Sequence, residues 1–142
     1  MATDRSGGAS VGARRVEGFT LIELMIVVAV IAILGTIANA SYKGYVIKSR
    51  RAAATTCLEE RAQFLERYYT TNLTYTGAPN PAQCGPELES FYEVTLNVTD
   101  SKSYTLTATP TDRQDDDKCG TLTLNARGQR TASGPSGVAD CW

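Results

Sequence analysis

The chain has 142 residues, 42% of them hydrophobic, a length that suffices for one small globular domain and one additional element. It contains no histidine, which excludes histidine-based triads and removes the commonest general base and zinc ligand. The formal net charge is -1, but from residue 57 onward twelve acids oppose seven basic residues. An acidic domain is a poor match to general binding of nucleic acids, which depends on neutralising phosphates.

A long apolar stretch follows a polar N-terminal segment. From Leu24 to Tyr42 the chain carries no charged residue, and as a helix these 19 residues span roughly 28 Å, about the thickness of a bilayer core. Arg14 and Arg15 precede the stretch and favour a membrane helix with its N-terminus towards the cytoplasm. A cleaved secretory signal, with Ala-Asn-Ala at 38–40 as the cleavage site, is the alternative.

Glu23 is the single acid at the start of this stretch. An ionised carboxylate in hydrocarbon is costly, so such an acid usually has a partner and a function. Candidate partners are Arg14 and Arg15, or a free α-amino group if the chain is cut between Gly18 and Phe19. Otherwise Glu23 lies in the headgroup layer at the start of a helix, where the helix dipole favours acids.

The helical pattern continues beyond the apolar stretch. Apolar residues recur at three- and four-residue steps, which predicts one helix from Phe19 to about Tyr69, on the order of 75 Å long. Beyond residue 50 its apolar stripe needs a cover, for which the strand-rich C-terminal half is available. The stripe consists of Val46, Ile47, Ala54, Leu58, Ala62, Leu65 and Tyr69.

Lys48, Arg50 and Arg51 form a basic cluster just beyond the apolar stretch. Three interpretations are open. The cluster binds anionic lipid headgroups, pairs with acids on neighbouring chains, or forms a solvated helix face.

The C-terminal half predicts a small antiparallel sheet, and with the long helix this gives an α+β fold. Residues 70–90 are rich in proline, glycine and other turn formers and predict a loop. Strands are predicted at 91–98, 104–110 and 120–126, and the first two alternate with a period of two around a hairpin turn at 99–103.

Residues 112–118, DRQDDDK, form a charged turn before the third predicted strand. Three consecutive aspartates raise the possibility of a calcium loop, but the ligand spacing and the distal bidentate Glu of such loops are missing. We therefore predict a solvated turn and no metal. The tail from Asn125 to Trp142 is predicted to be loop-like.

The segment GFTLIELMIVVAVIAIL, residues 18–34, resembles the N-terminal signature of type IV pilins and pseudopilins. The resemblance implies that a prepilin peptidase removes the leader 1–18 and N-methylates Phe19. It also implies that the helix 19–43 first spans the membrane and then forms the filament core. There Glu23 would meet the Phe19 ammonium of a neighbouring subunit, and because a lone buried carboxylate is penalised, this pair would set the register.

Two features depart from that family. The leader is longer than usual, and Val11 is an alternative translation start. Many pilins carry a proline where this chain has Ala40, and without it we expect a straighter helix.

The resemblance extends to short minor pilins, a group that includes competence pilins acting as DNA receptors. It is carried by AQFLERYYTTNLTYTGA, YTLTATP and CGTLTLNARGQR…ADCW. The implied fold is a long N-terminal helix packed on a small antiparallel sheet. Its globular domain, 44–142, comprises the amphipathic helix 44–69, the loop 70–90, and the sheet with the disulfide-bounded C-terminal region, 91–142.

Four cysteines in a small exported domain indicate disulfides in an oxidising compartment. Reduced thiols or a metal site are the alternatives, although no Cys-x-x-Cys pair is present. Sequence order favours Cys57–Cys84 and Cys119–Cys141, and the second pair matches the C-terminal disulfide typical of type IV pilins. Each closure would contribute roughly 3 kcal/mol in the chain-entropy model.

The predicted function is that of a structural subunit of a type IV pilus, minor rather than major, serving adhesion, twitching motility or DNA uptake. A major pilin, a secretion pseudopilin and a pilus-borne DNA receptor are the alternatives. No catalytic residues or cofactors are predicted, because no nucleophile elbow or phosphate loop is recognisable. Candidate DNA contacts are Arg127, Arg130, Lys102 and Lys118.

The expected partners are other pilin subunits, the prepilin peptidase, the inner-membrane assembly machinery and the membrane itself, with DNA as a partner of the receptor alternative. The expected location is the bacterial inner membrane, as a single-pass protein with a periplasmic C-terminal domain, and after assembly the extracellular pilus.

Overall fold

The computed structural model describes residues 18–80, 84–116 and 118–142, and it divides into two compact units between Ala38 and Asn39. Of the predicted leader, residues 1–17 lie outside the described residues, and so do Arg14 and Arg15, the upstream partners considered for Glu23.

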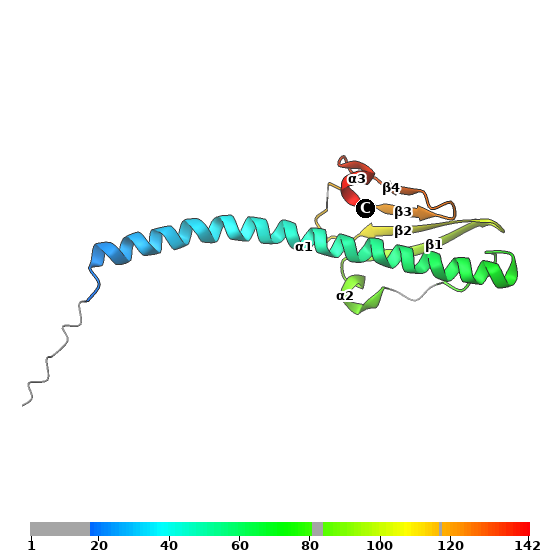
Figure 1. Cartoon of the computed structure of the whole chain (residues 1–142), viewed down its shortest axis with the longest axis horizontal. Coiled ribbons are helices and arrows are strands. Elements are labelled where there is room, and N and C mark those ends of the chain that lie inside the picture. The colour runs from blue at the N-terminus through cyan, green and yellow to red at the C-terminus, as the bar shows by residue number, and fades with distance from the viewer. Residues whose placement is uncertain (1–17, 81–83, 117) are drawn as a thin grey trace, which may run out of the picture. The chain divides into compact units, whose positions relative to one another are not determined.

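Helix α1 extends from Leu21 to Asn72 without interruption (Figure 1). It starts two residues after the predicted Phe19 and ends three residues beyond the predicted Tyr69, as is common at helix ends. Thr20 caps the helix: its Oγ1 accepts the Glu23 amide at 3.2 Å, and its carbonyl accepts the Leu24 amide at 3.2 Å.

The N-terminal unit exposes the apolar side chains of α1. Phe19, Ile22 and Leu34 are 83%, 63% and 60% exposed. Among the described residues, α1 is the one helix long and apolar enough to cross a membrane.

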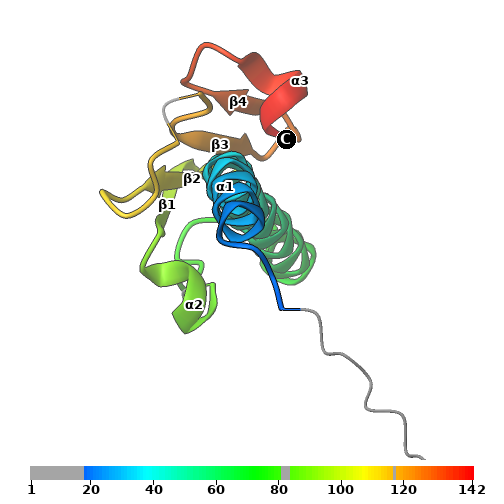
Figure 2. The same ribbon diagram turned by 90° about the vertical axis from the view of Figure 1, so that its left-hand side faces the viewer.

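The globular unit contains a four-stranded antiparallel sheet in the order β1-β2-β3-β4 (Figures 1 and 2). The end of the sheet that carries the β2–β3 connection, residues 111–121, is called the near end below. The far end carries the β1–β2 and β3–β4 turns, because antiparallel neighbours reverse direction. The strands are β1 (Tyr92–Asp100), β2 (Ser103–Pro110), β3 (Leu122–Asn125) and β4 (Arg130–Ala132).

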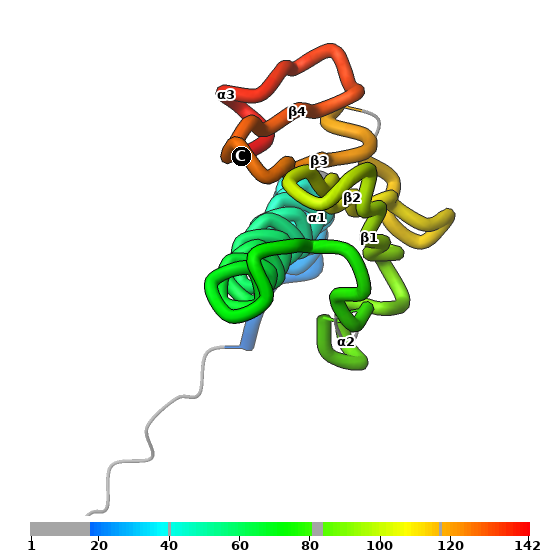
Figure 3. The backbone as a smooth tube through the Cα atoms, turned by 90° about the vertical axis from the view of Figure 1, so that its right-hand side faces the viewer, coloured from blue at the N-terminus to red at the C-terminus, as the bar shows by residue number. Residues whose placement is uncertain are grey.

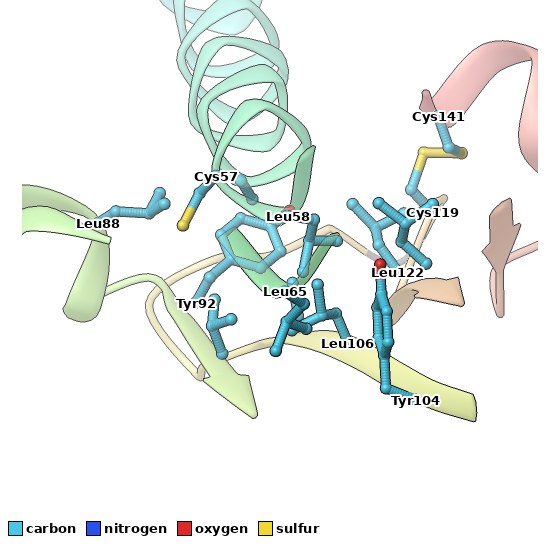
Figure 4. Packing of buried hydrophobic residues seen from close by; sticks show 14 of the residues in the cluster. Cys57, Leu58, Leu65, Leu88, Tyr92, Tyr104, Leu106, Cys119, Leu122 and Cys141 are labelled. Carbon is cyan, nitrogen blue, oxygen red and sulfur yellow. A yellow bond between two sulfur atoms is a disulfide. The ribbon is translucent and has the colours of Figure 1, made fainter. Parts of the chain in front are cut away.

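The core lies between the second part of α1 and one face of the sheet (Figure 4). Ala54, Leu58 and Leu65 of α1 are fully buried, as are Leu106 and Leu122 on the sheet. The predicted stripe is therefore the buried face of the helix, and its members at 46, 47, 62 and 69 are half-buried.

Threonines occupy the opposite face of the sheet, because side chains alternate along each strand. One row crosses all four strands: Thr95 pairs with Thr107, Thr107 with Thr123, and Thr123 with Thr131. The middle of this face is therefore polar but uncharged.

The structure corrects three local predictions. The predicted loop 70–90 contains a short helix, α2 (Gly85–Glu89), which starts with Pro86 in its first turn and buries Leu88. The tail is not loop-like, because it contains β4 and a second short helix, α3 (Gly137–Cys141). The hairpin turn between β1 and β2 is shorter than predicted and consists of residues 101–102.

Two disulfides close the globular unit, Cys57–Cys84 and Cys119–Cys141, with Cα–Cα distances of 5.8 and 5.6 Å. These are the pairs that the sequence order favoured. The first fastens α1 to the start of α2, and the second fastens the β2–β3 connection to α3. Next to this second disulfide, the indole of Trp142 donates to the Thr131 carbonyl of β4 at 2.9 Å.

We expect Leu58→Ala to lower the free energy of unfolding by about 3 kcal/mol, because the side chain is fully buried and its loss leaves a cavity. Phe64→Ala is the control on the same helix: its ring is 42% exposed, and we expect a loss of about 1 kcal/mol or less. Urea unfolding of the full chain in detergent, followed by circular dichroism, measures both. Equal losses would contradict the placement of the core.

Candidate functional site

The residues expected to act in processing and assembly lie together at the start of α1. Gly18 and Phe19 precede the helix, Thr20 caps it, and Glu23 lies in its first turn. Glu23 is exposed and, among the described residues, has no ion-pair partner. In the first turn of α1 an acidic side chain interacts favourably with the positive end of the helix dipole.

A buried ion pair joins α1 to the β2–β3 connection at the near end of the sheet. Arg51 Nη1 donates to both Asp116 oxygens, at 3.0 and 3.2 Å, and also contacts Cys119 Sγ. The side chains of Arg51 and Asp116 are 12% and 3% exposed. Arg51 is therefore not on a solvated helix face, which was one interpretation of the basic cluster. The prediction of a solvated turn at 112–118 is wrong for Asp116.

Two further side chains complete this polar cluster. The Tyr92 hydroxyl donates to Asp116 at 3.1 Å, and Gln114 Nε2 donates to the Ile47 carbonyl at 3.0 Å and to Tyr92 Oη at 3.3 Å. Burial raises the pKa of Tyr92 to about 12, with the Gln114 hydrogen bond acting in the opposite direction. The connection is thus fastened to α1 at residues 47 and 51, on either side of Arg50.

A tyrosine cluster joins the same helix to the far end of the sheet. The hydroxyls of Tyr75 and Tyr104 both donate to Glu66 Oε1, at 2.8 and 3.3 Å, and the Tyr75 amide donates to the Ser101 carbonyl at 2.9 Å. Burial, followed by the hydrogen bond to Glu66, raises the pKa of Tyr75 to about 12, and burial also raises the pKa of Tyr104. Both hydroxyls therefore stay protonated donors at neutral pH.

The sheet topology separates the four candidate DNA contacts. The β1–β2 and β3–β4 turns lie at the far end of the sheet, the end towards the viewer in Figure 3. Lys102 lies in the first turn and Arg127 in the second, and both are exposed. Arg130 starts β4 near the same end, but it pairs with Glu59 at 2.5 Å and lies over the Trp142 ring at 5.2 Å. Lys118 lies in the β2–β3 connection, at the near end with the aspartates.

A rigid turn presents Arg127. Asn125 Oδ1 accepts the amides of Arg127 and Gln129, both at 3.0 Å, and Gly128 supplies a positive φ of 72°. Lys102 and Arg127 lie at one end of the sheet, and the aspartates of the β2–β3 connection lie at the other. The sequence could not show this separation, because along the chain those aspartates lie between the two basic residues.

Of the clefts that open beside α1 in the described globular unit, two border Arg50. The larger, about 1060 Å³, lies between α1 and α2 and is walled by Arg50, Arg61 and the Cys57–Cys84 disulfide. The smaller, about 290 Å³, lies between α1 and the β2–β3 connection. The Arg50 guanidinium borders both clefts and stacks on Phe91, 3.5 Å from the ring centroid.

Metal ligands do not gather in the described part of the chain: no group of three or more Asp, Glu, Cys or His residues there could hold an ion. All four cysteines are in disulfides. Asp116, one of the three consecutive aspartates considered for calcium, is instead bound by Arg51.

The comparisons with known proteins agree with this geometry. The fold matches the structure of a type IV pilin from Shewanella oneidensis, with a TM-score of 0.56 and 33% identity over 68% of this chain and 97% of that one. It also matches the Neisseria meningitidis non-core minor pilin PilV, with a TM-score of 0.51 and 28% identity over 63% of this chain and 89% of that one. The fold is that of a type IV pilin.

Two family models match the sequence. A prokaryotic N-terminal methylation motif covers residues 13–39, and the model of the type IV minor pilin ComP, DNA uptake sequence receptor, covers residues 40–123, more than half of the chain. The chain belongs to this family of type IV minor pilins. The predicted α+β fold and the assignment as a minor pilin are thereby confirmed.

Curated relatives match over shorter stretches. The fimbrial protein EcpC of Eikenella corrodens is 43% identical over 54 residues, and a probable minor fimbrial protein of Dichelobacter nodosus is 51% identical over 37 residues. These alignments cover 38% and 26% of this chain, and the chain spans only 35% and 23% of the length of the two relatives.

We expect Asp116→Asn to lower the free energy of unfolding by about 3 kcal/mol, because it leaves the buried Arg51 guanidinium without a counter-charge. Asp115→Asn is the control. It removes the same charge from the neighbouring residue, whose side chain is exposed, and it should change the free energy of unfolding by no more than about 0.5 kcal/mol. Thermal unfolding of both variants at neutral pH distinguishes them. A loss for Asp116→Asn as small as that of the control would show that the ion pair does not hold the connection.

Proposed function

We propose that this minor pilin is cleaved after Gly18, inserted in the inner membrane through the helix 19–43, and then incorporated into a pilus. The globular domain, 44–142, would lie on the periplasmic side before assembly and outside the cell afterwards. The proposal rests on one observation at the start of α1: the residues that match the N-terminal methylation motif include a helical segment whose apolar side chains are exposed. These side chains need lipid first and neighbouring helices later.

Glu23 would act as the register residue. Cleavage would leave Phe19 as the N-terminal residue, and its ammonium is a natural counter-charge for a carboxylate that lacks a partner among the described residues of its own chain. Within a filament core, an unpaired carboxylate is penalised and a paired one is not, so only correctly placed subunits are favoured. The protein would therefore act by assembly, with the prepilin peptidase and the assembly machinery as partners, rather than by catalysis.

Glu23→Ala should reduce the amount of this protein in sheared filaments about tenfold or more, because the Phe19 ammonium would be buried without a partner. Its amount in the membrane fraction, and an intact mass beginning at N-methylated Phe19, should be unchanged. Glu60→Ala, at an exposed position of the globular unit, serves as the control and should enter filaments normally. Filament content of Glu23→Ala equal to that of Glu60→Ala would refute the register role.

DNA reception is a second candidate function. Two observations favour it: the matching family model is described as a DNA uptake sequence receptor, and Lys102 and Arg127 share the far end of the sheet, away from the aspartates of the β2–β3 connection. An acidic domain can still bind DNA at one end if that end is locally basic, since the Debye length at physiological salt is about 8 Å.

We expect Lys102→Gln with Arg127→Gln to weaken DNA binding in a gel shift and to lower the slope of log K against log salt by about 2, corresponding to two phosphate contacts. The matched control is Arg113→Gln with Lys118→Gln, which removes two charges at the near end. If both double variants bind DNA equally well, the far end is not a DNA-binding surface.

A further inference from the structure

The smaller cleft lies where the apolar part of α1 ends. The uncharged stretch ends at Tyr42, and Lys43 is the first charged residue after it. The cleft is lined from that point onward by Tyr42, Lys43 and Arg50 of α1. Since 19 helical residues span roughly 28 Å, Lys43 reaches the headgroup layer of the second leaflet when the helix crosses a bilayer.

The charge in the cleft is positive. Lys43 and Arg50 come from α1 and Arg113 from the β2–β3 connection, and Asp115 is the one carboxylate among the described residues that line it. Within the described residues none of the three cations has a carboxylate partner, because the ion pairs there are Arg51–Asp116 and Arg130–Glu59. Asp112, next to Arg113, is a further exposed acid but is not part of the lining.

Arg113 is held in place rather than mobile on a free loop. The following residue, Gln114, is 3% exposed and donates to the Ile47 carbonyl at 3.0 Å. Two residues further on, Asp116 is bound by Arg51. These two contacts fix the backbone of the connection against α1 and therefore the position of Arg113 over the cleft.

The remaining lining suits an amphipathic ligand. Val46 and Ile47 are half-buried and supply an apolar surface between the cations. Tyr42 and its neighbour Tyr45 are 68% and 72% exposed, and exposed tyrosines are typical of membrane interfaces. Cations beside a small apolar surface, next to exposed tyrosines, suit the phosphate and glycerol of a phospholipid at the bilayer surface.

We propose that this cleft binds the headgroup of an anionic phospholipid while the pilin is anchored in the membrane. The phosphodiester would lie among Lys43, Arg50 and Arg113. Its glycerol would lie against Val46 and Ile47, and its acyl chains would run back past Tyr42 into the bilayer. A zwitterionic choline headgroup fits less well, because its ammonium meets the same cations. The proposal rests on the membrane-anchored stage of the proposed function and not on incorporation into filaments.

Native mass spectrometry of the full chain, released from nanodiscs containing equal amounts of phosphatidylglycerol and phosphatidylcholine with identical acyl chains, tests the proposal. The wild-type protein should retain phosphatidylglycerol preferentially. Lys43→Gln with Arg113→Gln should lower retention of that lipid on the order of 25-fold, since a juxtamembrane cation contributes about a factor of five.

The control is Lys102→Gln with Arg127→Gln, which makes the same change in net charge at the far end of the sheet and should retain the lipid like the wild type. Equal retention of the two lipids by the wild type would overturn the proposal, as would an unchanged preference in the Lys43 and Arg113 double variant. If that variant keeps its lipid but no longer enters filaments, the cations act between subunits and the proposal is wrong. Because this readout needs no filament, its failure is distinguishable from a failure of the register role of Glu23.

Discussion

The burial of one helical stripe beneath one sheet is the constraint on which the globular unit depends. Ala54, Leu58 and Leu65 lie on a helix whose first part is apolar and exposed, and nothing within α1 itself can remove their surface from water. The sheet supplies the cover. The Arg51–Asp116 pair fastens the β2–β3 connection to α1, and the two disulfides fasten α2 to α1 and α3 to that connection. The same element can therefore be apolar all round before residue 43 and amphipathic after residue 50.

The fold distributes charge between the two ends of the sheet. At the near end, Arg51 neutralises a buried aspartate, and Lys43, Arg50 and Arg113 have no carboxylate partner among the described residues. At the far end, Lys102 and Arg127 lie on tight turns, while the threonine row between the two ends carries no charge. The two ends of the sheet therefore differ in charge from the row of threonines between them.

Local patterns in the sequence predicted the elements whose residues repeat. The stripe from Ala54 to Tyr69 has helical spacing, and the first two strands alternate, so both were found within a few residues of their bounds. Helices α2 and α3 and strand β4 were missed because three to five residues are too few to show a period. The Arg51–Asp116 pair joins residues 65 positions apart in the chain, and helical periodicity cannot predict a contact over that separation. The assembly role of Glu23 remains a prediction.

The order of the disulfides along the chain has a consequence for biosynthesis. Each cysteine is bonded to the next one in sequence, 57 to 84 and 119 to 141, so the two closed loops do not overlap. A chain that is oxidised from its N-terminal side as it emerges joins the first two cysteines before the third is available. Of the three pairings that four cysteines allow, this one forms by the simplest order of events and needs no later reshuffling by an isomerase.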